Sequence, residues 1–169
     1  MLETEDELIR MQQLLDVSAR EAGPHLKSII TDDRRLSASE VCRRLQGMCL
    51  LSLATATADG RPLVGLVDGY MIHGSFHFSS GRDAVRIRHL SARPAVSALH
   101  LPGDDLAVTV HGRAELFELS DPAHRDLRQA MLDEYLPKAG PAFETWLDSE
   151  DPIGARIMAE KMFTFSLES

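Results

Sequence analysis

The feature that most restricts the fold is a change of hydrophobic period near residue 48. Earlier in the chain, apolar residues such as Met11 and Leu15 recur at the spacing of a helix. From residue 48 onward, MCLLSLATAT alternates in the manner of a half-buried strand. Turn sequences then follow at short intervals, at Ala58-Asp59-Gly60, Gly74-Ser75 and Pro102-Gly103-Asp104. Tight turns join antiparallel neighbours, so the sequence predicts an antiparallel β fold.

Six strands are expected in the chain, with one arginine-bearing helix inserted among them. The strands are predicted at residues 48–57, 61–74, 75–79, 95–101, 105–119 and 161–168. Asp121 and Pro122 open a later amphipathic helix, in which Leu127, Met131 and Tyr135 have helical spacing. Six antiparallel strands suit a small closed barrel better than an open sheet, because closure removes the unpaired edges.

Residues 1–35 are predicted to form a helical extension, and residues 36–169 the barrel domain. A first helix is expected over residues 5–22, ended by Gly23 and Pro24. The sequence SASE at residues 37–40 fits a capping box and announces a second helix, which runs to Gly47. No internal repeat or long linker divides the chain further.

Charge and composition exclude several classes of function. The chain of 169 residues has a formal net charge of −8, which argues against nonspecific nucleic-acid binding. No apolar run reaches the roughly 18 residues that a membrane span requires, and the N-terminal sequence MLETEDELIR lacks the pattern of a signal peptide. Cys42 and Cys49 match no metal or redox spacing. We expect a cytoplasmic protein that acts on a small molecule, without nucleic acid or membrane.

Positive charge is concentrated in FHFSSGRDAVRIRHLSARP, residues 76–94, which contains four arginines. As a helix, this stretch places Arg82, Arg86, His89 and Arg93 in one narrow arc. Ser79, Ser80 and Gly81 precede the arc and offer hydroxyl and backbone N–H donors. Short donors, a helix N-terminus and a guanidinium together form a phosphate site. The alternative is a solvated polar face, since Asp83 already complements the helix dipole.

Other chemistries receive little support from the sequence. There is no GxSxG motif, and the seven histidines show no metal-ligand spacing, although a single histidine suffices to bind haem. His77 either lines a site or lies at the surface. Trp146 either ends a helix packed on the barrel or covers a cofactor pocket.

Residues 36–167 resemble the pyridoxamine 5'-phosphate oxidase-like family of split β-barrels. The resemblance rests on LATATADGRP, FHFSSGRDAVRIRHLSARPAVSAL and VHGRAEL, which occur in that order. It implies a mostly β fold with flanking helices, a six-stranded Greek-key-like barrel, and a homodimer with FMN or coenzyme F420 at the subunit interface. It also implies a set of cofactor-binding residues: Arg61, the backbone of Val64, Gly65 and Leu66 against the ring, and Ser79, Ser80, Arg82 and Arg86 at the phosphate.

The chain departs from the true oxidase at three places. Leu66 stands where the oxidase has a lysine, and Ala107 where it has a ring-contacting glutamine. The ending FTFSLES lacks the tryptophan–arginine–leucine sequence of the oxidase. Vitamin B6 oxidation is therefore not expected. The resemblance implies an oxidoreductase that transfers a hydride to or from a small organic substrate. Such a ring supplies its own chemistry, so no catalytic residue is assigned. The alternatives are a haem-binding or haem-degrading protein and a non-catalytic cofactor carrier or sensor.

Overall fold

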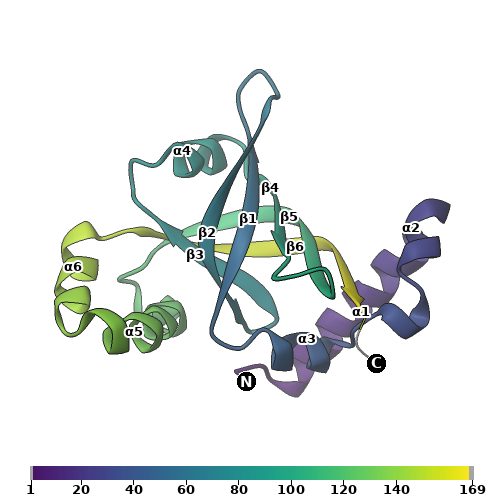
Figure 1. Ribbon diagram of the computed structural model, residues 1–169. Coiled ribbons are helices and arrows are strands. Elements are labelled where there is room, and N and C mark those ends of the chain that lie inside the picture. The colour runs from purple at the N-terminus through teal and green to yellow at the C-terminus, as the bar shows by residue number, and fades with distance from the viewer. Residues whose placement is uncertain (1, 168–169) are drawn as a thin grey trace.

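The computed structural model describes residues 2–167, in which six strands close into a barrel (Figure 1). The strands are β1 (Met48–Ala56), β2 (Pro62–Ile72), β3 (Ser75–Ser80), β4 (Ala95–His100), β5 (Leu106–Glu118) and β6 (Ile153–Ser166). Every pair is antiparallel, and the order around the barrel is β1-β2-β3-β6-β5-β4. The predicted closed six-stranded barrel is confirmed.

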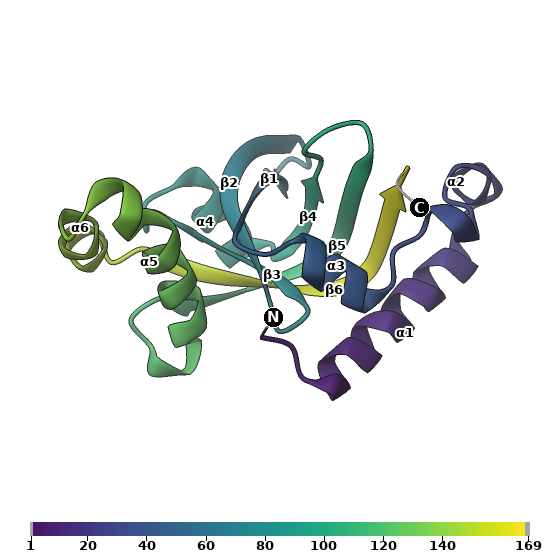
Figure 2. The same ribbon diagram turned by 60° about the horizontal axis from the view of Figure 1, so that its bottom comes forward.

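Helices flank the barrel on opposite sides (Figures 1 and 2). One side carries α1 (Glu5–Glu21), α2 (Pro24–Ile29), the 3-10 turn η1 (Asp32–Arg34) and α3 (Ala38–Arg44). The other carries the 3-10 turn η2 (Pro122–His124), α5 (Arg125–Ala139) and α6 (Ala142–Glu150). A separate helix, α4 (Val85–Ala92), connects β3 to β4. None of the helices within residues 2–167 combines the length and apolar character that crossing a bilayer requires.

Capping residues fix where the N-terminal helices begin. Thr4 and Glu7 form a capping box at α1, and the predicted box of Ser37 and Glu40 is confirmed at α3. Helix α1 ends before Gly23, as predicted, but a further helix follows directly after the extended residues Ala22 and Gly23. Pro24 begins α2, because proline is well suited to the first position of a helix.

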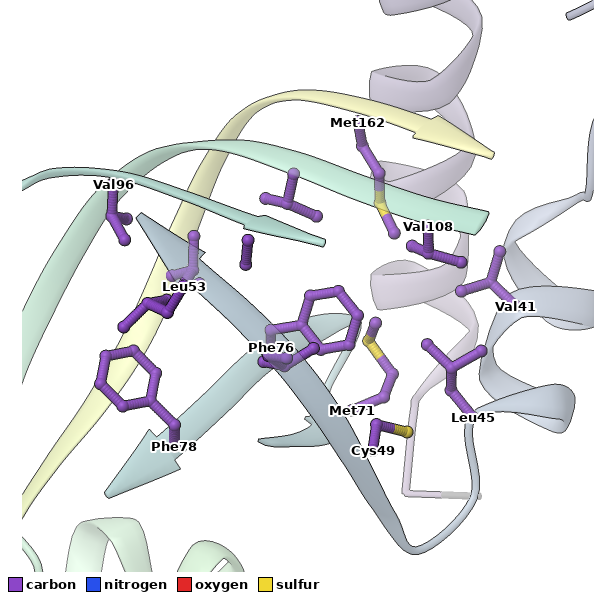
Figure 3. Close-up of a cluster of buried hydrophobic side chains, with 14 of the residues drawn as sticks. Val41, Leu45, Cys49, Leu53, Met71, Phe76, Phe78, Val96, Val108 and Met162 are labelled. Carbon is purple, nitrogen blue, oxygen red and sulfur yellow. The ribbon is translucent and has the colours of Figure 1, made fainter. Parts of the chain in front are cut away.

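The main core lies inside the barrel and continues under α1 and α3 (Figure 3). Phe76 and Phe78 of β3 are almost fully buried at its centre. Met11 of α1 and Val41 of α3 belong to the same cluster, so the N-terminal helices contribute directly to the barrel core. The division of the chain at residue 36 stays a prediction.

A second apolar cluster attaches α5 and α6 to the outer side of β2. Tyr70 and Ile72 of β2 pack there against Leu127 and Met131 of α5 and Leu147 of α6. The spacing predicted for the amphipathic helix therefore places Leu127 and Met131 correctly.

Two element boundaries differ most from the sequence prediction. The arginine-bearing helix begins at Val85, because residues 81–84 form a turn closed by a hydrogen bond from Ala84 N to Gly81 O. Arg82 therefore precedes the helix, and the prediction that it occupies the helix N-terminus is wrong. Strand β6 begins at Ile153 instead of near residue 161. Its first half contains glycine, alanine and arginine, which hide the alternation that marks a strand.

Candidate functional site

The barrel is split where β2 and β3 diverge. Strand β3 pairs with β2 only over residues 69–72 of β2. Its last residues, Ser79 and Ser80, pair with β6 along the other edge of β3 but have no partner in β2. Residues 62–68 of β2 consequently have an edge without a β3 partner. The segment that joins β3 to α4, residues 79–86, faces this edge; we call this segment the corner.

Arg86 connects α4 to the open edge of β2. Its Nη1 donates a hydrogen bond of 2.9 Å to the backbone oxygen of Leu66. Its Nη2 lies 3.2 Å from the position that a Cβ on Gly65 would occupy. The structure thus brings Arg86 together with Gly65 and Leu66, three of the residues predicted to bind the cofactor.

Only part of the predicted arc lies on α4: Arg86 and His89 belong to the helix and contact the barrel, whereas Arg82 precedes it and Arg93 is its C-cap. Besides Arg86, His89 Nδ1 lies 3.0 Å from Thr55 Oγ1, and Arg93 Nε donates to Ala56 O at 3.1 Å. These contacts anchor α4 to β1 and β2. Basic residues on this helix therefore satisfy backbone carbonyls and a buried hydroxyl, a role that the sequence alone did not indicate.

Arg82 is held between two carboxylates. It forms a bidentate pair with Glu118, with Nη1–Oε1 and Nη2–Oε2 distances of 3.1 and 2.7 Å. Its Nη2 also lies 2.6 Å from Asp151 Oδ2 and 3.0 Å from Asp151 O. The hydrogen bond with Glu118 raises the pKa of Arg82 and lowers the pKa of the Glu118 carboxyl.

The two serines of the corner point in different directions. Successive side chains of a strand alternate between its two faces. Ser79 Oγ lies 3.6 Å from Met131 Sδ of α5, on the outer face of β3. Ser80 consequently points to the opposite face, so β3 does not present both hydroxyls to one anion.

Arg61 lies in the turn that joins β1 to β2, which projects beyond the barrel (Figure 1). Its Nε donates to Asp59 Oδ2 at 2.8 Å, and three quarters of its side chain is exposed. This turn is stabilised locally by Thr57, whose hydroxyl accepts from Arg61 N at 2.9 Å.

Apolar side chains are exposed on the outer face of β1 and β2. Val64 and Leu66 are 70% and 63% exposed, and Leu50 on the neighbouring strand is 52% exposed. On β1, the small residues Ala54 and Ser52 lie directly beside Val64 and Leu66 in the sheet. Exposed apolar side chains grouped on one face are a common feature of ligand and subunit contacts.

Sequence reasoning missed an aromatic row that begins next to this face. Tyr135 of α5 donates a hydrogen bond to Asp68 of β2 and stacks on Phe143 at a centroid distance of 4.8 Å. Phe143 in turn contacts Trp146 at 5.5 Å. Trp146 itself remains half exposed, while the helix that contains it packs on the barrel through Leu147, as one interpretation expected.

His77 neither lines a site nor lies at the surface, which corrects both interpretations of the sequence. It is 6% exposed, because α5 and β5 cover the outer face of β3. Its Nδ1 bonds to Ser75 O at 3.1 Å, and burial lowers its pKa to about 4. Within residues 2–167, no group of side chains has the arrangement of a metal site.

Comparison with known families identifies a match to a family model. The model for pyridoxamine 5'-phosphate oxidase matches residues 39–159. No curated protein matches the chain.

Several solved structures share the fold at low sequence identity. A conserved hypothetical protein from Mycobacterium tuberculosis is 21% identical, with a TM-score of 0.66 over 80% of this chain and 88% of its own. HutZ, the heme storage protein from Vibrio cholerae, is 20% identical, with a TM-score of 0.62 over 80% of this chain and 99% of its own. An F420 reductase is 20% identical, with a TM-score of 0.53 over 70% of this chain and 91% of its own. At such identities the likeness establishes the fold alone.

Proposed function

The chain belongs to the pyridoxamine 5'-phosphate oxidase family, and from this premise we propose that it is a cytoplasmic oxidoreductase that binds FMN or coenzyme F420. The reaction would be hydride transfer to or from a small organic molecule. The observation that supports the proposal most directly is the contact of Arg86 with Leu66 at the open edge of β2. A cationic group, an unpaired strand edge and an exposed apolar face meet at this point.

The residues present fit a flat ring that carries a phosphate. Leu66 directs its backbone oxygen toward Arg86, and the N–H of a strand residue points to the same side as its oxygen. A guanidinium has five N–H donors, so Arg86 keeps donors for a phosphate after the bond to Leu66. The absence of a side chain at Gly65 leaves room for this guanidinium beside the strand.

The proposed contacts follow from this geometry. Arg86 would hold the phosphate, and the backbone of Val64, Gly65 and Leu66 would face the ring. Of the two serines, Ser80 would supply a hydroxyl, because Ser79 faces Met131. The bound ring would supply the hydride chemistry.

The two remaining predicted contacts each require a change of partner. Arg82 would reach the phosphate only in exchange for Glu118 and Asp151. Arg61 would reach the ligand by leaving Asp59, an exposed pair whose loss costs little.

We further propose that the protein is a homodimer with the cofactor at the subunit interface. The exposed apolar side chains of Leu50, Val64 and Leu66 support this assembly, because a partner and a ring would cover them. Light scattering on the purified protein measures the mass directly. A monomer at micromolar concentration would contradict the assembly.

Haem binding is the second candidate, and one exposed histidine favours it. His111 lies on the outer face of β5, where its Nδ1 is 2.8 Å from Ser97 Oγ. HutZ, which shares the fold, is a heme storage protein. An absorption spectrum distinguishes the candidates, since haem gives a Soret band. Loss of that band in His111→Ala would support haem, whereas a flavin or deazaflavin spectrum would support the first proposal.

The decisive experiment is a titration of the purified protein with FMN and F420, followed by fluorescence. Arg86→Ala should lose affinity by about 10- to 100-fold, since a charge-assisted bond contributes about 1.5–3 kcal/mol. Arg88→Ala is the matched control, because the Arg88 side chain hydrogen-bonds to the backbone oxygen of Asp83 in the turn and not to β2. Unchanged affinity in Arg86→Ala would place the phosphate elsewhere. Turnover of the reduced cofactor with an acceptor would then separate an enzyme from a carrier.

A further inference from the structure

Arg82 occupies the centre of a junction of three elements. It leaves the corner, contacts Glu118 at the end of β5, and contacts Asp151 between α6 and β6. Ile153, the first residue of β6, is the register partner of Glu118, so Asp151, two residues before β6, lies close to Glu118. The junction therefore connects the corner to the end of α6.

Asp151 has an unusual backbone conformation, which its contacts with Arg82 help to hold. Its φ of 41° is left-handed, which costs energy for any residue with a side chain and least for Asn and Asp. Both its carboxylate and its backbone oxygen accept hydrogen bonds from Arg82. Two contacts to one guanidinium help to hold the residue in this conformation.

The guanidinium of Arg82 is already paired, although the corner is expected to bind an anion. Both Glu118 and Asp151 contact it through their carboxylates. A dianionic group that approached Arg86 would therefore meet no free charge from Arg82.

We propose that Glu118 and Asp151 form an acidic latch that competes with the anionic group of the ligand for Arg82. The proposal rests on the proposed function, because it concerns the same corner. When the ligand is absent, the latch holds Arg82. When a phosphate binds at Arg86, Arg82 exchanges its carboxylate partners for phosphate oxygens.

The exposure of the two carboxylates makes this exchange feasible. The side chains of Glu118 and Asp151 are 56% and 51% exposed, so water solvates each of them once Arg82 leaves. Exposed ion pairs of this kind contribute little net stability. The latch therefore lowers the affinity of the protein for the ligand below the value that two unpaired arginines would give. Ligand binding also removes the contact of Arg82 with Asp151 and so loosens the end of α6.

The test is the double variant Glu118→Gln/Asp151→Asn, titrated with FMN and, separately, with inorganic phosphate. Both substitutions keep the shape and an oxygen acceptor, and asparagine tolerates the left-handed conformation at residue 151. We expect the dissociation constant to fall by about five- to tenfold, the size expected for removing two exposed ion pairs. The single variant Glu118→Gln, which leaves Asp151 unchanged, should give a smaller gain and serves if the double variant folds poorly.

A mutant cycle with Arg82→Ala separates the latch from a general effect of charge. In the Arg82→Ala background, neutralising Glu118 and Asp151 should change affinity less than twofold, because no guanidinium remains to be released. Glu144→Gln/Asp148→Asn is the matched control. It removes two carboxylates that surround Arg128 in the same manner, at 3.1 and 2.8 Å. This control should leave affinity unchanged.

Each outcome bears on the latch. Tighter binding that requires Arg82 supports it. Unchanged or weaker binding in Glu118→Gln/Asp151→Asn overturns it and leaves the proposed function intact. A gain in affinity that persists in the Arg82→Ala background has the same consequence. A protein that binds neither FMN nor F420 in any of these forms overturns the latch and the proposed function together. Hydrogen exchange of the amides in residues 147–154 adds a readout besides affinity: FMN should accelerate it in the native chain.

Discussion

The Nε2 atom of His73 lies 2.9 Å from a carboxylate oxygen of Asp126, at the first turn of α5. Its other ring nitrogen, Nδ1, lies 3.2 Å from Glu7 of α1. Only the protonated imidazole donates at both nitrogens, and the hydrogen bond with Asp126 accordingly raises the pKa of His73. One side chain in the β2–β3 turn therefore connects the N-terminal helix to the helical pair on the opposite side.

This arrangement predicts a stability contribution that falls as pH rises. The folded-state pKa of His73 is above its unfolded value, so the contribution is fully present below about pH 6.5 and disappears as pH rises through the folded pKa. Relative to the native chain, His73→Gln should lose at most about 1 kcal/mol near pH 6, because these pairs are exposed, and almost nothing near pH 9. Urea denaturation at both pH values measures the difference.

His25→Gln is the control for this prediction. His25 is exposed in α2, and its substitution should leave the pH dependence of unfolding unchanged. A deficit in His73→Gln that is equal at the two pH values would show that the contacts do not depend on the charge of the imidazole.

His77 should produce the opposite dependence on pH. Burial lowers its folded-state pKa to about 4, below the unfolded value, so the unfolded state binds a proton first as pH falls. The native chain should lose up to about 1.4 kcal/mol per pH unit between about pH 6.5 and pH 4 through this residue. His77→Gln should be less stable at neutral pH and show a shallower acid slope. Equal slopes in urea titrations would mean that His77 accepts a proton without unfolding.

Gly112→Ala should be strongly destabilising. A Cβ at this position would lie 2.1 Å from the backbone oxygen of Met158, next to the register shift between β5 and β6. Because a backbone atom cannot move aside cheaply, we expect a loss of about 2–4 kcal/mol in the free energy of unfolding. Gly23→Ala is the control, since a Cβ there meets no atom within 4 Å. Similar thermal midpoints for the two variants would show that the strands adjust at the bulge.

Local signals in the sequence were sufficient to predict the barrel, because alternation and turn residues act over a few positions. They predicted β1 and its turn well, and they placed Arg86 and His89 on one face of the helix. They did not predict the partners of Arg82, because Glu118 and Asp151 are 36 and 69 residues away in the chain. A pairing at that separation depends on the register of β5 and β6, which no local pattern in this sequence specifies. The start of β6 was missed because Gly154 and Ala155 are small and Arg156 is charged.

Gly65→Ala should weaken ligand binding without weakening the fold. The new Cβ would lie 3.2 Å from Arg86 Nη2, and only the Arg86 side chain comes within 4 Å of it. The guanidinium must shift, which disturbs its hydrogen bond to Leu66 and its orientation toward the ligand. We expect affinity for FMN or F420 to fall by about two- to fivefold, or about 0.4–1 kcal/mol, with little change in thermal midpoint.

Gly69→Ala, four residues along β2, is the control. It should lower the thermal midpoint and leave affinity unchanged, because its Cβ would lie 2.2 Å from Leu51 in the core. If Gly65→Ala binds the cofactor as tightly as the native chain, the phosphate does not depend on the position of Arg86, and the contact between α4 and β2 is structural.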